Sequence, residues 1–261
     1  MEQGQLKVLR AWFDGYVRGY YSDDADLQVG VRLKEEHTYR VCRLILQIGR
    51  SLQLTAEDLD LAEAVALFHD LGRFKQYVQY RTFNDRRSEN HALLGLQELE
   101  RVAALRALPE PERRIIKTAV EHHNACELPG TLQGRELLYL RLIRDADKLD
   151  VLEMTVQYLT SPSEALKPVL GSNLADKGEC SRVLVENLLH QRKCYYDDVK
   201  TLNDRKLLLL SWHYDLNFPY SLAEAARKGY IKKIIDSLPD TEVIRSIDSC
   251  LQNYLMDRVP K

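Results

Sequence analysis

The chain has 261 residues, of which 45% are hydrophobic and 29% charged, and only 12 glycines and 8 prolines, so it is not collagen-like, of low complexity or largely disordered. Its 37 basic and 39 acidic residues give a net charge of −2 without blocks of like charge. We therefore expect neither duplex nucleic acid nor a membrane as a partner, and we expect function to reside in a localised site.

The cysteines and the N-terminal residues indicate the compartment. The five cysteines include no C-x-x-C pair, which argues against a disulfide framework or a zinc ribbon and favours free thiols in a reducing environment. The first ten residues lead into no apolar run of the kind that a secretory signal contains, and no stretch of about 18 apolar residues predicts a membrane span. We therefore expect a cytoplasmic protein.

Apolar residues recur with a period of 3.6 along nearly the whole chain, and no window alternates between apolar and polar residues as a half-buried strand would. The sequence therefore predicts an all-α fold. The expected helices span residues 31–50, 58–70, 88–105, 110–123, 135–159, 180–193, 203–212, 221–238 and 242–256.

The spacing of these helices suggests three parts. Residues 1–30 are an N-terminal helical extension, and residues 31–160 are the domain that carries most of the histidines. Residues 161–261 are a C-terminal helical subdomain packed on it, with a loosely patterned boundary at 161–179 that holds two prolines and two glycines. The extension presents an aromatic helix face, for which core packing is favoured over ligand stacking, formed by Trp12, Phe13, Tyr16, Tyr20 and Tyr21.

Two of the histidines are expected to point inward. His37 shares a helix face with Leu33 and Val41, although a lone histidine of this kind is more often a buried imidazole than a ligand. The pair His69-Asp70 ends an apolar helix, with Gly72 at a plausible position to terminate it. Burying an ionised aspartate there is costly unless a cation or hydrogen-bond donors offset the charge.

Three further positions follow along the chain. Gly95 lies four residues after His91, on the same face, where a missing side chain allows another element to approach closely. His122 and His123 both border the inner face of their helix, and their spacing does not decide between them. In the last segment Asp147 aligns with the apolar face and is a better inward ligand than Asp145.

This ordered set of histidines and aspartates resembles the HD-domain superfamily of metal-dependent phosphohydrolases. The resemblance covers roughly residues 30–160 and implies an HD-domain helical bundle with additional C-terminal helices. It implies a first metal held by His37, His69, Asp70 and Asp147, and a second held by Asp70, as the bridging ligand, with His91 and either His122 or His123. Imidazole and carboxylate ligands suit one or two divalent transition metals, with Mn, Fe, Co or Ni favoured and Mg or Zn also compatible.

The resemblance further implies a function. The expected reaction is cleavage of a small phosphate ester, with a nucleotide as the favoured class, by attack of a metal-bound hydroxide. Catalytic roles are assigned to Arg73, Asp70 and Lys148, and substrate contacts to Arg73, Arg81, Arg86 and Tyr80. A base would stack on Tyr80 or on Phe83, and a loop that only packs is the alternative use of this segment. The ligand order is similar to that of the binuclear HD-GYP phosphodiesterases. However, Arg73 replaces their lysine, Asn124 replaces their glutamate, and no G-Y-P follows, which argues against cyclic di-GMP as the substrate.

Two alternatives remain at this level. Di-iron oxygenases of the myo-inositol oxygenase kind use a closely similar six-ligand set on the same scaffold, so the spacing of the ligands does not exclude them. A ligand-sensing module is disfavoured because no expected ligand is missing. The helices after residue 179 are compatible with a cap over the site or with a homodimer surface.

Overall fold

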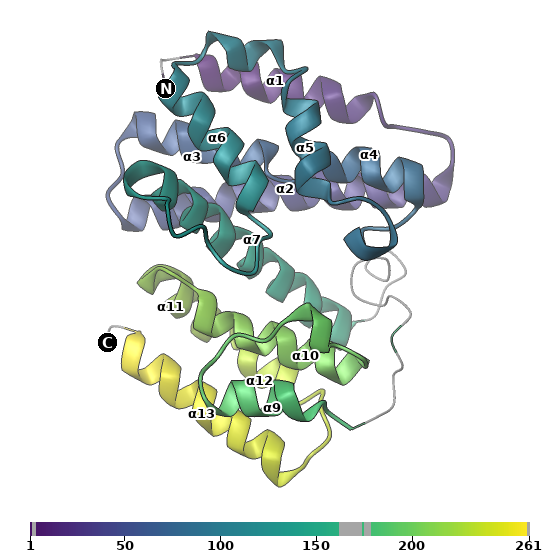
Figure 1. The fold of residues 1–261 in the computed structure, drawn as a ribbon, viewed down its shortest axis with the longest axis vertical. Coiled ribbons are helices and arrows are strands. Elements are labelled where there is room, and N and C mark those ends of the chain that lie inside the picture. The colour runs from purple at the N-terminus through teal and green to yellow at the C-terminus, as the bar shows by residue number, and fades with distance from the viewer. Residues whose placement is uncertain (2–3, 162–173, 175–178, 260–261) are drawn as a thin grey trace. The chain divides into compact units, whose positions relative to one another are not determined.

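The computed structural model describes residues 1, 4–161, 174 and 179–259, and helices are the regular secondary structure throughout this part of the chain (Figure 1). The predicted all-α class is therefore confirmed. None of the described helices combines the length and the apolar character that crossing a bilayer requires.

The chain divides into two compact units, residues 1–150 and 151–261. The division falls inside a long helix, whereas the boundary expected at 161–179 lies largely outside the described residues. The first unit contains α1 (Gln5–Arg18), α2 (Ala25–Ser51), α3 (Ala56–Phe68), α4 (Leu71–Tyr80), α5 (His91–Leu99), α6 (Glu110–His122) and the first part of α7 (Gly134–Thr160), with 3₁₀ turns η1 (Asp85–Arg87) and η2 (Ala103–Ala107).

Side-chain caps fix where several of these helices begin. The Asp24 carboxylate accepts a hydrogen bond from the Leu27 amide at 3.0 Å at the start of α2, and Thr55 accepts one from the Asp58 amide at 3.2 Å at the start of α3. Asn90 accepts from the amides of Ala92 and Leu93 at the start of α5. Each cap satisfies an amide that has no partner within its helix, so the caps define where the site-bearing helices start.

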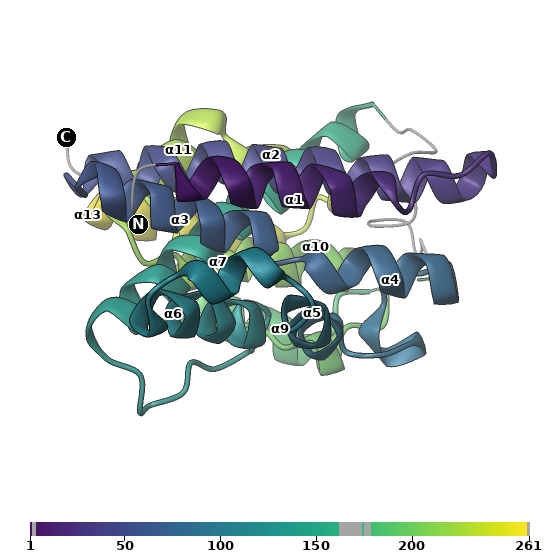
Figure 2. The same cartoon turned by 90° about the horizontal axis from the view of Figure 1, so that it is seen from above.

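The core of the first unit is built around α2, which lies against both α3 and α4 (Figure 2). The aromatic face of α1 packs on this core: Phe13 is fully buried and meets Phe74 edge to face, with ring centroids 5.9 Å apart. Tyr21, by contrast, is 44% exposed. Most of the aromatic face therefore serves packing, as the sequence predicts, but its last member does not.

The segment after the His69-Asp70 pair differs from the prediction. A new helix, α4, begins at once, where the sequence analysis expected a loop, and Gly72 lies in its first turn rather than terminating a helix. A Cβ atom on Gly72 would lie 2.1 Å from the carbonyl oxygen of His91, so glycine is required for α4 and α5 to touch. The expectation for Gly95 is met, because a Cβ there would lie 2.9 Å from Val120 Cγ1.

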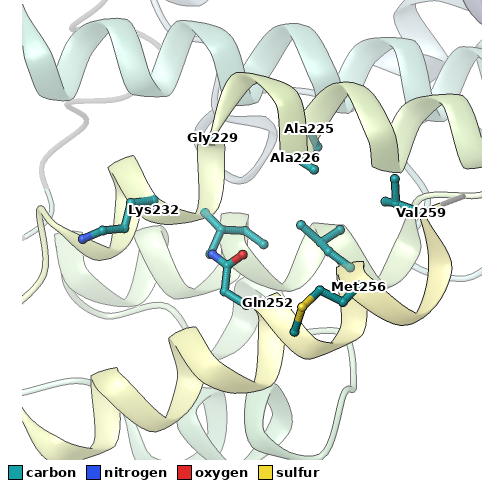
Figure 3. Close-up of a pocket in the computed structure, with 9 residues that line it drawn as sticks. Ala225, Ala226, Gly229, Lys232, Gln252, Met256 and Val259 are labelled. Carbon is teal, nitrogen blue, oxygen red and sulfur yellow. The ribbon is translucent and has the colours of Figure 1, made fainter. Parts of the chain in front are cut away.

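The second unit contains the end of α7 with α9 (Arg182–Leu189), η3 (Tyr196–Asp198), α10 (Leu202–Ser211), η4 (Trp212–Asp215), α11 (Pro219–Lys228), α12 (Tyr230–Ile235) and α13 (Glu242–Arg258). The helix expected over 221–238 is interrupted by Gly229, whose φ of +67° suits glycine and ends α11. Residues of α11, α12 and α13 line a mostly apolar pocket of about 650 Å³ (Figure 3). Met256 and Val259 lie on its wall.

Candidate metal centre

Five helices of the first unit contribute to one cluster of histidines and aspartates. His37 lies in the middle of α2, the His69-Asp70 pair follows α3, and His91 opens α5. His123 directly follows α6, and Asp147 lies in α7. The members of the cluster other than Asp147 are buried, whereas the Asp147 side chain is 26% exposed.

One oxygen of Asp70 faces a first group of ligands. His37 Nε2 lies 3.5 Å from Asp70 Oδ2 and 3.3 Å from His69 Nε2. Asp147 Oδ1 lies 3.2 Å from His37 Nε2 and 4.0 Å from His69 Nε2. We call these four residues the first half-site.

The other oxygen of Asp70 faces a second group. His91 Nε2 and His123 Nε2 lie 3.4 and 3.5 Å from Asp70 Oδ1, and 2.9 Å from each other. We call Asp70, His91 and His123 the second half-site. Because Asp70 presents a different oxygen to each group, its carboxylate occupies the position of a bridging ligand.

The donor atoms of both half-sites suit a metal ion. Metal–nitrogen bonds of about 2.1 Å place neighbouring ligands about 3.0 Å apart in an octahedron and about 3.4 Å apart in a tetrahedron, and most of the observed separations lie within about 0.1 Å of this range. In each half-site two Nε2 atoms face each other, while the Nδ1 atoms face oxygen acceptors. Imidazoles that donate from Nδ1 and carry no proton on Nε2 would direct two Nε2 lone pairs at one another, and a cation between them would convert this repulsion into ligation.

The two half-sites have the same kinds of hydrogen-bond partner for the Nδ1 atoms of their histidines. In the first, His69 Nδ1 donates to the Ala66 carbonyl oxygen at 2.7 Å, and His37 Nδ1 lies 2.7 Å from Asp150 Oδ2. In the second, His123 Nδ1 donates to the Val120 carbonyl oxygen at 2.9 Å, and His91 Nδ1 lies 2.7 Å from Asp85 Oδ2. Each half-site thus has one histidine held by a carbonyl and one held by a carboxylate.

Cations close to the cluster stabilise its buried carboxylates. Lys34 Nζ lies 2.6 Å from Asp70 Oδ2, with the Lys34 side chain only 8% exposed. Burial alone raises the pKa of Asp70, but Lys34 and His69 outweigh that effect and hold the pKa well below its usual range. Asp70 is therefore ionised and available as a ligand at neutral pH.

The histidines differ in protonation. Burial lowers the pKa of His69 to about 4 and that of His91 to about 3, where the nearby Arg73 acts in the same direction. Burial and Lys34 also oppose protonation of His37, but its contacts with carboxylates, Asp147 first, prevail and raise its pKa to about 10. His69 and His91 are neutral and ready to bind a metal at pH 7, whereas His37 must release a proton.

The structure distinguishes the adjacent histidines that the sequence left unresolved. His123 joins the cluster, whereas His122 points elsewhere: its ring is 26% exposed and lies 3.7 Å from Glu121. His122 is therefore not brought to the second half-site. The reason is geometric, since successive helical residues diverge by about 100° and only the second follows the inner face past the end of α6.

The residues assigned to substrate by sequence are dispersed. Arg81 pairs with Asp24 at 2.8 Å and is half exposed, and the Tyr80 hydroxyl donates to Glu89. Arg86 is exposed on η1. Tyr80 and Arg81 are thus engaged by partners outside the cluster.

Arg73 lies closer to the centre, and Lys148 neighbours Asp147 in the sequence. Arg73 Nε is 3.5 Å from Asp70 Oδ1, while its Nη1 donates to Asp85 Oδ1 at 2.8 Å and to the Phe83 carbonyl oxygen at 2.6 Å. Lys148 follows Asp147 in α7 and is buried. Arg73 thus combines proximity to a ligand with a role in holding the segment around η1.

Residues 35–152 match the family model of the HD domain. The chain carries an HD domain. This domain is typical of metal-dependent phosphohydrolases, and the matched range contains all members of both half-sites. No curated protein and no solved structure matches the chain.

Sequence analysis missed three side chains that support the HD domain's ligands. Lys34 precedes His37 by three residues on the same helix face, a spacing that could have indicated its approach to the site. Arg40 Nε contacts Asp150 Oδ1 at 2.6 Å and so holds the carboxylate behind His37. Asp85 lies in a polar turn without periodicity, so its contact with His91 had no signal in the sequence.

Proposed function

We propose that this protein is a metal-dependent phosphohydrolase that cleaves a small phosphate ester, with a nucleotide as the favoured class. The observation that supports this most directly is the placement of the two Asp70 oxygens toward separate histidine pairs. Two ions held in this way would supply an activated water and a polarised phosphoryl group at neutral pH.

The chain's own residues would orient a substrate from the side of Asp147. Its side chain is the most exposed of the cluster, which suggests that the phosphate approaches along α7. Lys34 and Arg73 are cations in contact with Asp70, and Lys148 follows Asp147 in the sequence. Charge-assisted hydrogen bonds from such groups to phosphate each contribute on the order of 1.5–3 kcal/mol.

The proposal is tested with purified protein and added Mn²⁺, Co²⁺ or Ni²⁺ against a panel of nucleotides and generic phosphate esters, with release of inorganic phosphate as the readout. We expect Asp70→Ala to lose more than about 100-fold in kcat/KM, because removing a shared ligand exceeds the effect typical of an outer-shell change. His122→Ala is the matched control, because this histidine lies outside the cluster, and it should retain activity. Activity in Asp70→Ala equal to that of the wild type would refute the assignment.

The same purified, metal-loaded protein distinguishes hydrolysis from the oxygenase alternative. Iron-dependent, substrate-dependent oxygen uptake without phosphate release would favour it over hydrolysis. Turnover with a redox-inert ion such as Mg²⁺ or Zn²⁺ would exclude it.

A further inference from the structure

Asp85 occupies an unusual junction beside the second half-site. It lies on η1, in the segment 81–90 that connects α4 to α5, and both of its oxygens are engaged. Oδ2 accepts from His91 Nδ1 at 2.7 Å, while Oδ1 accepts from Arg73 Nη1 and from Gln76 Nε2, each at 2.8 Å. The carboxylate therefore connects a metal ligand with the connecting segment and with α4.

Other contacts of the segment involve the same two side chains of α4, Arg73 and Gln76. Arg73 Nη1 also donates to the Phe83 carbonyl oxygen at 2.6 Å, and Gln76 Nε2 donates to the Glu89 carbonyl oxygen at 2.8 Å. Gln76 is fully buried, so these bonds are shielded from water. Two side chains of α4 thus hold the segment at both ends, and Asp85 is the point at which it reaches His91.

The first half-site is supported differently. His37 Nδ1 is held by Asp150, which lies on the same long helix as Asp147, and Asp150 is held in turn by Arg40 of α2. Both supports belong to regular helices. In the second half-site the supporting carboxylate lies on a short 3₁₀ turn within a connection between two α-helices, so there the orientation of the histidine depends on how a surface segment is folded.

We propose that Asp85 is a positioning residue that couples the order of segment 81–90 to metal binding at the second half-site. An ion at this half-site requires His91 to keep its proton on Nδ1 and its lone pair on Nε2, which is the state that Asp85 selects. By reciprocity, the ion then stabilises the Asp85 contact and hence the folded segment. This inference rests on the proposed two-metal site but not on the reaction that the site catalyses.

Limited proteolysis can report whether segment 81–90 is folded. Arg81, Arg86 and Arg87 are exposed, so trypsin can cleave after them when the segment opens. Cleavage follows the population of the open form when opening is fast, and an ion that binds only the closed form reduces that population. At about ten times the dissociation constant of the second ion, cleavage should slow about 10-fold.

The experiment combines Co²⁺ titration, followed by calorimetry and visible absorption, with limited trypsinolysis followed by mass spectrometry. The variants are Asp85→Ala, Asp85→Asn and a matched control, Glu89→Ala. Glu89 lies in the same segment and accepts a hydrogen bond from Tyr80 at the end of α4, and no contact joins it to a histidine of the cluster among the described residues. Circular dichroism and melting temperature establish that each variant is folded.

We expect Asp85→Ala to weaken one of two Co²⁺ sites by about 10–100-fold and to abolish protection from trypsin, with Asp85→Asn intermediate. Glu89→Ala should be cleaved faster with and without Co²⁺ but should keep both affinities and the protection. In a His69→Ala background, which disables the first half-site, Asp85→Ala should weaken the remaining site. In a His123→Ala background, which disables the second, it should have no effect on metal affinity.

The outcomes separate the two proposals. If the wild type binds no Co²⁺, the two-metal site and this inference both fail. If it binds two ions and Asp85→Ala leaves both affinities and the protection unchanged, the inference alone fails. An equal loss in the His69→Ala and His123→Ala backgrounds also overturns it, since that result indicates a general structural role.

Discussion

Asp70 shows at the scale of a single residue how the site constrains its surroundings. An ionised carboxylate that is only 4% exposed is costly unless opposite charge and hydrogen-bond donors compensate. Here Lys34 supplies the nearest positive charge, at 2.6 Å, and four histidines surround the two oxygens. The same arrangement that stabilises the charge without an ion prepares it to bind one.

The histidine pKa values predict how the metal-free protein responds to acid. A histidine whose folded pKa lies below its unfolded value of about 6.5 contributes stability above pH 6.5 and loses it as the pH falls toward the folded pKa. For His69, with a folded pKa of about 4, this loss is on the order of 3 kcal/mol. His91 acts in the same direction, whereas the raised pKa of His37 contributes stability that is fully present below about pH 6.5 and is lost progressively as the pH rises from there through about 10.

We therefore expect the free energy of unfolding of the metal-free protein to fall steeply between pH 6.5 and pH 4, measured by urea denaturation in the presence of a chelator. His91→Gln, which removes one titrating group, should make the free energy of unfolding fall less steeply over this pH range. A free energy of unfolding that is flat across this range would contradict the assigned protonation states.

At the scale of elements, the site depends on how closely α4 and α5 approach. Gly72 and Gly95 lie at this contact, and the backbone of α4 meets the backbone of α5 at His91, the first residue of α5. The space is filled by main chain rather than by flexible side chains, so a Cβ on Gly72 cannot be accommodated by rotation. The position of His91 relative to Asp70 therefore depends on this glycine.

Gly72→Ala should reduce the free energy of unfolding by about 1–3 kcal/mol or more, because the new methyl group forces the two backbones apart. Gly15→Ala is the matched control: Gly15 is exposed in α1, and a Cβ there meets nothing within 4 Å. This control should stabilise the protein by up to about 1 kcal/mol through its helix propensity. Equal effects of the two changes in chemical denaturation would refute the packing argument.

At the scale of the whole molecule, the ligands join helices that are far apart in sequence. His37 and Asp147 are separated by 110 positions, and the cluster draws on α2, α3, α5, α6 and α7. These side chains come together only when the first unit is folded, so an ion held by them would bind the native state in preference to the unfolded chain.

Added metal should therefore stabilise the protein, by about 2.7 kcal/mol when its concentration is 100 times the dissociation constant. Differential scanning calorimetry with Mn²⁺ and with a chelator measures this shift. His69→Ala should abolish it, whereas His190→Ala should not, because His190 is exposed at the end of α9 in the second unit. An identical melting temperature with and without metal in the wild type would contradict the proposed site.

The sequence by itself determined the all-α class and the order of ligands, because helical periodicity and the His-Asp motifs are local patterns of residue type and spacing. The structure brings together His37, His69, Asp70, His91 and Asp147, which the same local patterns had singled out. Only the tertiary structure decided between His122 and His123, since that choice depends on how the end of α6 is directed toward α5. It also decided the helical state of residues 71–80 and the supporting roles of Lys34 and Asp85. The Lys34 contact joins positions 36 residues apart and needs separate helices to pack together, and the Asp85 contact needs the connecting segment to fold back on the start of α5.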